Sequence, residues 1–202
     1  MLTFRELVAA IGGAPRVTIH GPWARCIEYA LLQGPPPGRP AGNPPEPLWS
    51  AGSVLNGARF TPIGSFSTLY LASDFVTAQV ETGSVFTHAA LLATTIATNP
   101  VVTFAVDGVL ADVVDLHDQA VLAMLGTSAS ELTGSWLLAS PAPTQELGRA
   151  AFDSGRITAL KYPSSKRTGG WGVAVFVERL GLNPANFVEV IDKTSKLAQR
   201  LP

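Results

Sequence analysis

Three side chains of kinds found in active sites lie at an even spacing in GARFTPIGSFSTLYLASDFVTAQVET, residues 57–82. Arg59, Tyr70 and Glu81 follow one another at intervals of eleven residues in a stretch that is otherwise poor in charge. An arginine can hold a diphosphate with its planar donor fork, a tyrosine can stack on a ring, and a carboxylate can stabilise a developing positive charge. Taken singly, each residue is more typical of an ordinary strand or helix position, so the spacing alone leaves a site and a plain scaffold both open.

A second candidate region is the loop KYPSSKRTGGWG, residues 161–172, in which Ser164 and Ser165 precede a basic pair and two glycines. Such a loop can offer hydroxyl and backbone N–H groups to a phosphate or another polar ligand group. It is equally typical of a plain hairpin loop between two strands. The sequence contains no Walker loop and no GxGxxG, HExxH or GxSxG motif, so the common nucleotide, metalloprotease and hydrolase patterns are missing.

The composition limits the class of protein. The chain has 202 residues, of which 47% are hydrophobic, and this suits one domain with a sizeable core. Only 14% of the residues are charged, against roughly 25% in typical soluble domains, and the formal net charge is −1. This balance gives no general attraction to nucleic acid or to an anionic membrane. The low charge implies more apolar surface, which we interpret as an indication of a stable partner or of self-association.

Cysteine and histidine usage indicates no metal centre. Cys26 is the only cysteine, which excludes an internal disulfide and a zinc site of several thiolates, and it fits a reducing compartment. His20, His88 and His117 are far apart and show no ligand spacing. The N-terminus does not resemble a signal peptide, and the longest apolar run, residues 85–98, is too short and too polar to span a bilayer. The expected location is the cytoplasm.

The hydrophobic periodicity predicts helices and strands in mixed order. We expect strands over residues 57–61, 67–72, 101–106, 111–116, 157–162, 172–180 and 187–191. We expect a helix from a capping box of Thr3 and Glu6 to Gly12 and Gly13, helices over 75–82, 118–125, 129–138 and 144–154, and a helical or mixed run over 85–98.

Strands that arrive in pairs favour an α+β fold, with a largely antiparallel or split sheet, flanking helices and one domain over residues 1–202. The stretch GPPPGRPAGNPPEP, residues 34–47, is expected to be a loop because proline removes backbone donors and fixes φ. The last residues, about 192–202, are expected to form a polar tail.

Four short motifs occur in a characteristic order. They are Gly-Ala-Arg-Phe-Thr-Pro at 57–62, Thr-Leu-Tyr-Leu-Ala at 68–72, Thr-Ala followed by Glu at 77–81, and Tyr-Pro-Ser at 162–164. Together they resemble the RES domain, a family named for an arginine, a glutamate and a serine. The resemblance is densest over residues 48–82 and returns over 151–180.

The resemblance implies a toxin of a bacterial toxin–antitoxin pair that acts on NAD, is neutralised by an Xre-like antitoxin and has a fold similar to that of ADP-ribosyltransferases. By position, the family arginine falls on Arg59, its tyrosine on Tyr70, its glutamate on Glu81 and its serine on Ser164, with Ser165 as the alternative. The arginine, the tyrosine and the serine would also bind NAD.

Three positions qualify the match. Many members carry an arginine near the N-terminus, which matches Arg25 in PWARC as a further NAD-binding residue. Many members also read Gly-Gly-Arg followed by an aromatic residue and asparagine, whereas this chain has Ala58 and Thr61. Alanine limits the backbone if the family glycine uses a positive φ, and threonine lacks the two-way hydrogen bonding of an amide.

The chemistry implied by the resemblance needs a single carboxylate. Cleavage of the nicotinamide–ribose bond of NAD gives an oxocarbenium-like ribose and a leaving group that departs neutral, so no general acid is required. Glu81 would stabilise the ribose, Tyr70 would stack on nicotinamide, and no metal is needed. The acceptor stays open between water, inorganic phosphate and a protein side chain. A protein ADP-ribosyltransferase, a non-catalytic nucleotide-binding module and a structural partner protein therefore stay open as alternatives.

Overall fold

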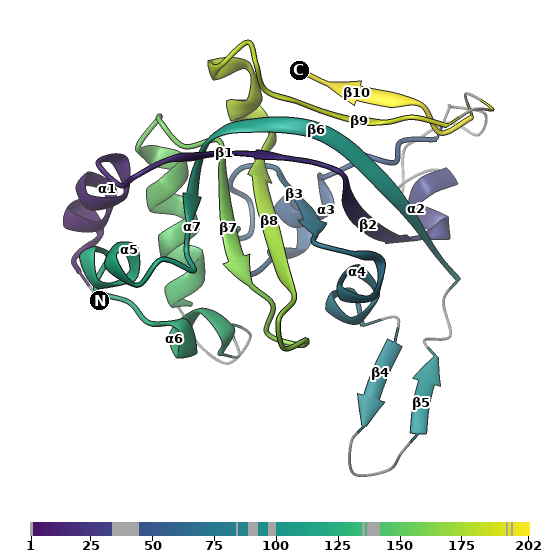
Figure 1. Ribbon diagram of the computed structural model, residues 1–202, viewed down its shortest axis with the longest axis horizontal. Helices are drawn as coiled ribbons and strands as arrows, with labels where there is room; N and C mark the ends of the chain where they lie inside the picture. Colours follow the sequence, from purple (N-terminus) through teal and green to yellow (C-terminus); the bar gives the residue numbers. More distant parts are fainter. Residues whose placement is uncertain are drawn as a thin grey trace.

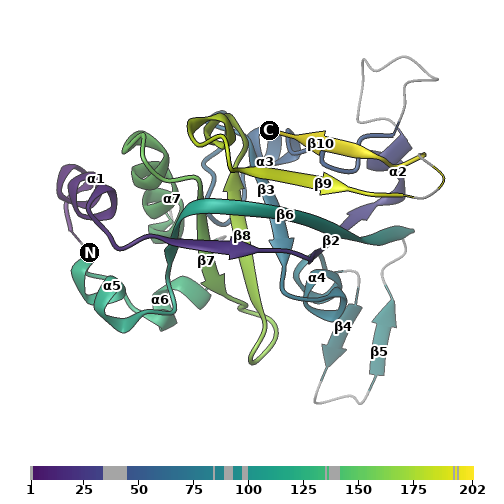
Figure 2. The same ribbon diagram turned by 45° about the horizontal axis from the view of Figure 1, so that its top comes forward.

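The computed structural model describes residues 2–33, 45–83, 85–88, 93–96, 100–134, 136, 142–192, 194 and 196–202. Figure 1 shows a mixed α+β fold in which one large sheet is flanked by helices. In both ribbon views (Figure 1, Figure 2), four helices gather at one end of the sheet: α1 (Phe4–Gly12), α5 (Gln119–Met124), α6 (Ala129–Thr133) and α7 (Pro143–Asp153). Helices α2 (Tyr29–Gln33) and α4 (Phe75–Glu81) lie at the other end. Among the described residues, no helix has the length and apolar character needed to cross a membrane.

The large sheet runs in the order β10-β9-β6-β2-β3-β8-β7, and β1 pairs with β6 beside this path. Its strands are β1 (Val17–His20), β2 (Trp23–Glu28), β3 (Thr68–Ala72), β6 (Val101–Asp115), β7 (Ala159–Pro163), β8 (Trp171–Phe176), β9 (Phe187–Val190) and β10 (Gln199–Leu201). All these pairings are antiparallel except that of β6 with β7. The predicted α+β class with a largely antiparallel sheet is therefore confirmed.

The strands of the sheet form a closed circuit, and one pairing in this circuit is very short. Because β6 pairs with both β2 and β7, the strands β6, β2, β3, β8 and β7 form a closed circuit of hydrogen-bonded neighbours. Within this circuit, β2 and β3 share a single residue pair, Ala24 with Ala72. The two strands therefore diverge beyond this pair, and the split opens between them.

Strand β6 corrects one prediction from the sequence. Residues 101–106 and 111–116 were expected as two strands, but they belong to one strand of 15 residues. Gly108 lies inside the strand and pairs with Val188 of β9. The two strands are so close here that a Cβ on Gly108 would lie 2.3 Å from the carbonyl oxygen of Phe187. The two halves of β6 pair with different strands, β2 over 101–106 and β7 over 113–115.

Two other predicted strands are shorter or different. Residues 57–61 form a tight turn rather than a strand, closed by hydrogen bonds of 2.8 and 3.1 Å between the main chains of Ala58 and Thr61. The strand expected over 172–180 ends at Phe176, and Val177–Leu182 form a 3-10 helix.

The remaining differences lie near the gaps in the described residues and at the end of the chain. The run 85–98 contains the antiparallel strands β4 (Val85–His88) and β5 (Ala93–Ile96) rather than a helix, and its other residues lie outside the described ranges. The helix expected over 129–138 ends at Thr133. The expected polar tail contains β10, which pairs with β9. The expected loop 34–47 falls outside the described residues over 34–44.

Alternate side chains of β3 face opposite sides of the sheet, as predicted. Leu69 and Leu71 are buried in a cluster with side chains of β2, β6 and β8. Tyr70 packs against the other large cluster, which contains Leu7, Leu122 and Leu147 of the helices α1, α5 and α7. The hydroxyl of Tyr70 is thereby directed to the side of the sheet where the 57–61 turn lies, as its hydrogen bonds there show.

Helix α7 holds this turn by a close backbone approach. Gln145 donates from its side-chain amide to the carbonyl oxygens of Ala58 and Thr61, at 3.0 and 3.3 Å. Gly148 lies directly against the turn, because a Cβ there would fall 1.9 Å from the carbonyl oxygen of Phe60. Phe60 itself is fully buried, so the turn cannot move outward without exposing it.

We expect Gly148→Ala to destabilise the protein by about 2–3 kcal/mol, because the methyl group would force α7 away from the turn. For a domain of this size this corresponds to a fall of roughly 5–10 °C in the midpoint of thermal unfolding. Gly181→Ala is the matched control, since nothing lies within 4 Å of a Cβ at that position. Equal midpoints for the two variants by differential scanning calorimetry would contradict the close packing of α7 on Phe60.

Candidate active site

Residues from five separate segments line a cavity of about 550 Å³. Arg59 comes from the 57–61 turn, Tyr70 from β3, Glu81 from the end of α4, and Ser165 from the loop after β7. The three residues with even spacing in the sequence are thus brought into one cavity together with one serine of the predicted loop. The other lining residues are Gly57, Ala58, Thr82, Thr133, Gly134, Trp136, Tyr162 and Lys166.

The carboxylate of Glu81 is held on one side only. Its Oε1 accepts a short hydrogen bond from Ser164 Oγ and another, of 3.2 Å, from the main-chain N–H of Ser165. Its Oε2 accepts no hydrogen bond from any residue that the structure describes. One oxygen therefore fixes the orientation of the carboxylate, and the other is left for a ligand in the cavity.

Arg59 is anchored to the end of α6 and to the serine loop. Its Nη1 donates to the carbonyl oxygens of Leu132 and Gly134, at 2.6 and 3.1 Å. Its Nη2 donates to Ser165 Oγ at 2.7 Å. Among the described residues Arg59 forms no ion pair with a carboxylate, so Ser165 links it to Glu81 and the positive charge stays available to an anion.

Tyr70 is a neutral ring rather than a base. Burial raises the pKa of Tyr70 to about 12, although hydrogen bonds with Thr61 and Phe60 and the charge of Arg59 act in the opposite direction. Its hydroxyl accepts from the main-chain N–H of Phe60 at 3.0 Å and lies 3.1 Å from Thr61 Oγ1. The phenol therefore ties β3 to the 57–61 turn, and the ring is left to face the cavity.

The serine loop is fixed to the same helix that carries Glu81. Ser164 Oγ accepts from the main-chain N–H groups of Lys166 and Arg167, at 3.2 and 3.1 Å. Arg167 donates to both carboxylate oxygens of Asp74, each at 2.5 Å, and Asp74 is the N-cap of α4. Lys166 Nζ donates to the main-chain oxygen of Glu81 at 2.9 Å. Both ends of α4 are thus tied to the loop that presents Ser164.

Comparison with known proteins identifies the family. The sequence profile of the RES domain matches residues 37–194 of this chain. The chain belongs to the RES domain family. Its fold is similar to that of a chain in the crystal structure of the M. tuberculosis MbcT–MbcA toxin–antitoxin complex, with a TM-score of 0.64 and 21% sequence identity over 97% of this chain and 91% of that chain. A search of curated proteins found no match.

The two departures from the usual RES motif cause no strain. Ala58 does not have a positive φ, and the left-handed conformation of this segment is carried by Gly57, with φ 70°. Thr61 Oγ1 donates to Thr68 Oγ1 at 2.8 Å and also lies within hydrogen-bond distance of the Tyr70 hydroxyl. Threonine at this position of the RES domain therefore supports Tyr70 through a buried hydroxyl pair.

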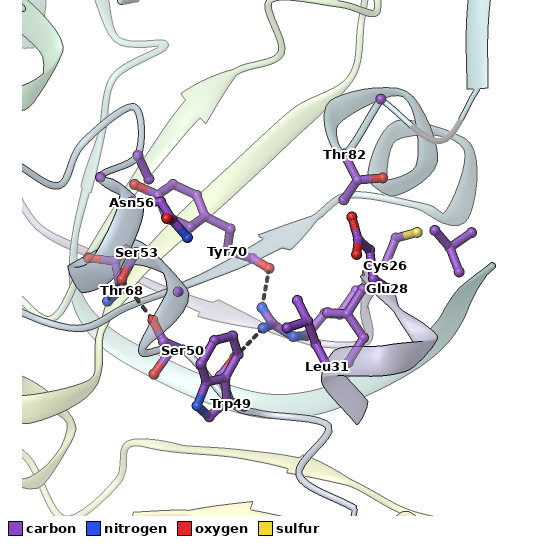
Figure 3. Close-up of a pocket in the computed structure, with 17 residues that line it drawn as sticks. Cys26, Glu28, Leu31, Trp49, Ser50, Ser53, Asn56, Thr68, Tyr70 and Thr82 are labelled. Atoms are coloured by element: carbon purple, nitrogen blue, oxygen red, sulfur yellow. Dashed lines mark hydrogen bonds between the residues drawn. The ribbon is translucent and has the colours of Figure 1, made fainter. Parts of the chain in front are cut away.

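Arg25, the fourth residue implied for NAD binding, lies beside this cavity rather than in it. The residue is only 8% exposed, and its guanidinium donates to the main-chain oxygens of Pro47, Trp49 and Tyr70, at 2.9, 2.5 and 3.1 Å. Burial lowers the pKa of Arg25 to about 10. Arg25 lines a neighbouring cavity of about 780 Å³, drawn in Figure 3, which shares Gly57, Ala58, Tyr70 and Thr82 with the first.

Sequence reasoning gave no role in the site to Tyr162, Lys166 or Trp136 of the smaller cavity. Lys166 and Tyr162 flank the serines, so their position in the loop motif was an available signal. Trp136 lies far from every RES motif in the sequence, and only the fold brings it to the cavity. No three His, Cys, Asp or Glu side chains of the described ranges cluster as metal ligands.

We expect the Asp74–Arg167 pair to stabilise the protein more at neutral pH than in acid. Burial alone raises the pKa of Asp74, but hydrogen bonds from Thr77, Ser73 and Arg167 outweigh it and hold that pKa well below its usual value. A depressed pKa contributes stability that is fully present above the unfolded-state value of about 4, and this contribution decreases progressively as the pH falls from there through the lower folded-state pKa. Asp74→Asn keeps an N-cap but loses the charge, so it should cost about 1 kcal/mol at pH 7.

The measurement is urea unfolding of wild type and Asp74→Asn at pH 7 and pH 3, where the difference in free energy should shrink at the lower pH. Asp118→Asn is the matched control, because Asp118 caps α5 and forms no ion pair with a described residue. A difference that is the same at both pH values would contradict the role of the Asp74 charge.

Proposed function

We propose that this RES domain is an NAD-consuming toxin that cleaves the nicotinamide–ribose bond of NAD. The observation that carries the proposal is the Glu81 carboxylate in a cavity beside Tyr70. One of its oxygens is held by Ser164 and Ser165, and the other accepts no hydrogen bond from a described residue. This is the arrangement that an oxocarbenium-like transition state requires, because a fixed negative charge stabilises it without reorganisation.

Each residue of the cavity then has a distinct task. The Tyr70 ring would stack on the nicotinamide, and its raised pKa keeps the phenol neutral near physiological pH. Arg59 would bind a phosphate oxygen with the N–H groups that it does not use for Leu132, Gly134 and Ser165. Glu81 Oε2 would accept a ribose hydroxyl and stabilise the ribosyl cation as neutral nicotinamide departs.

The acceptor of the ADP-ribosyl group is water or inorganic phosphate in this proposal. Lys166 and Arg59 line the cavity and give it a positive charge that suits an anionic diphosphate and an incoming phosphate. Transfer to a protein side chain is the alternative within the same chemistry, and nucleotide binding without turnover is the alternative outside it. Product analysis by mass spectrometry, with and without phosphate, separates these alternatives.

We expect Glu81→Gln to lower the rate of nicotinamide release from NAD by at least roughly 100-fold, since it removes the negative charge that faces the ribose. The amide oxygen can still accept from Ser164 and Ser165, so the fold should be retained in circular dichroism. Glu189→Gln is the control, because Glu189 pairs with Arg200 on β9 and β10, away from the cavity.

Two results would overturn the proposed activity. One is intact NAD after incubation with wild-type protein, both in plain buffer and with phosphate. The other is nicotinamide release that is equal in wild type and Glu81→Gln. Either would favour nucleotide binding without turnover or a protein substrate.

The partner in this proposal is an antitoxin protein, by analogy with the MbcT–MbcA toxin–antitoxin complex, one chain of which has a similar fold. Its Xre-like type is proposed from the resemblance to the RES family alone. Leu55 and Ile63 are 59% and 72% exposed, and Ile63 lies beside Gly57 at the smaller cavity. These apolar side chains are candidates for a surface that the antitoxin covers, or that a second copy covers by self-association.

We expect the chain to bind its neighbour-encoded antitoxin with loss of NAD turnover, and Ile63→Asp to weaken this complex by 10-fold or more, because a charge would be buried in an apolar contact. Size-exclusion chromatography with light scattering, combined with the turnover assay, measures both effects. A monodisperse monomer with no affinity for the antitoxin would contradict the proposed partner.

A further inference from the structure

The cavity of about 780 Å³ is larger than the one that contains Glu81, and the two lie side by side. They share Gly57 and Ala58 on one side and Tyr70 and Thr82 on the other. We call the cavity with Glu81 the ribosyl chamber and the larger one the second chamber. The segment Gly57–Ala58 carries almost no side chain, so little side-chain volume separates the two chambers on that side.

Trp49 is held in the second chamber before any ligand arrives. Its main-chain oxygen accepts from Arg25 at 2.5 Å, and its main-chain N–H donates to the carbonyl of Glu46 at 3.0 Å. Its ring packs on Gly52 at the start of α3 (Gly52–Asn56), where a Cβ would lie only 3.1 Å from Cζ3. Figure 3 shows the indole at the edge of the chamber. A fixed, flat indole is a platform for a stacked base.

Two polar side chains of the second chamber have no partner in the described part of the protein. Glu28, at the end of β2, and Asn56, at the end of α3, both line the chamber and make no side-chain hydrogen bond to a described residue. In Figure 3 the two side chains lie on opposite sides of the drawn residues, with Tyr70 between them and Trp49 below. A carboxylate suits a ribose diol, and an amide suits the donor and acceptor edge of a purine.

The charge of the second chamber also suits a nucleotide. Arg25 is a buried cation whose hydrogen-bond partners among the described residues are main-chain oxygens and no carboxylate. Arg25 lines the second chamber and Arg59 lines the ribosyl chamber, so the shared wall has a guanidinium on each side. A diphosphate at this junction would lie between two positive charges.

We infer that the second chamber binds the adenosine half of a dinucleotide, with Trp49 as the platform for the base, and that this chamber selects dinucleotides over mononucleotides. The inference rests on the proposed function, in which the ribosyl chamber holds the nicotinamide riboside half. It makes Trp49 a specificity-determining residue that does not touch the bond being cleaved.

The first test compares NAD with nicotinamide mononucleotide as substrates. Trp49→Ala should lower kcat/KM for NAD by roughly 10- to 100-fold, through KM, and leave kcat/KM for the mononucleotide unchanged. The hydrogen bond from Arg25 to Trp49 uses only the main-chain oxygen of Trp49, which alanine retains, so the fold should survive. Trp136→Ala is the matched control, because Trp136 lines the ribosyl chamber and its loss should affect both substrates alike.

The second test does not depend on turnover. Isothermal titration calorimetry with AMP and the Glu81→Gln protein should show binding that Trp49→Ala weakens by a similar factor and Trp136→Ala does not change. Gly52→Ala, which displaces the indole without removing it, should give an intermediate loss.

The outcomes separate the inference from the proposed function. If NAD is not turned over but AMP binds and Trp49→Ala weakens that binding, the proposed activity is wrong and the second chamber is still a nucleotide site. NAD turnover in which Trp49→Ala affects both substrates equally, or failure of AMP to bind to the Glu81→Gln protein, would overturn the inference about the second chamber.

Discussion

The buried guanidinium of Arg25 is the interaction on which the shape of the cleft depends. Strands β2 and β3 share only the pair Ala24–Ala72, and beyond it Arg25 bridges the opening by donating to the main-chain oxygens of Tyr70, Pro47 and Trp49. Burying a cation without hydrogen-bond partners is strongly unfavourable in free energy. The loop and the strand are therefore held where their main-chain oxygens can accept from the guanidinium. The split thus stays open as a cavity instead of collapsing into a continuous sheet.

The candidate catalytic side chains are likewise held in place by hydrogen bonds between polar groups. Each polar group near Glu81 is held by another: Ser164 and Ser165 by the loop that Arg167 ties to Asp74, and Arg59 by Ser165 and the end of α6. This network fixes geometry without neutralising charge, because the described structure contains no ion pair between Arg59 and Glu81. In the proposed function, these two preorganised charges of opposite sign suit a substrate that carries a diphosphate and a cationic ring.

Local signals in the sequence predicted local structure well and long-range pairing poorly. The capping box of Thr3 and Glu6 forms as expected, since both residues lie within one helical turn. The strand-like segment 57–61 became a turn because α7 packs on it through Gly148, which no local pattern reveals. Asp107-Gly108 is a pair typical of turns, but β9 passes close enough to keep β6 extended through it. In each failure a distant segment overrode a local preference.

By itself, the sequence determined the fold class, the motif order that marks the RES domain, and the residues Arg59, Tyr70, Glu81 and Ser164 as the candidates. These depend on residue type and local spacing, which the chain carries without folding. Only the tertiary structure decided that Ser165 joins Arg59 to Glu81, that Arg25 holds the split, and that a second chamber with Trp49 adjoins the first. The physical reason is that these contacts join segments from distant parts of the chain, and their distances depend on how the whole sheet closes.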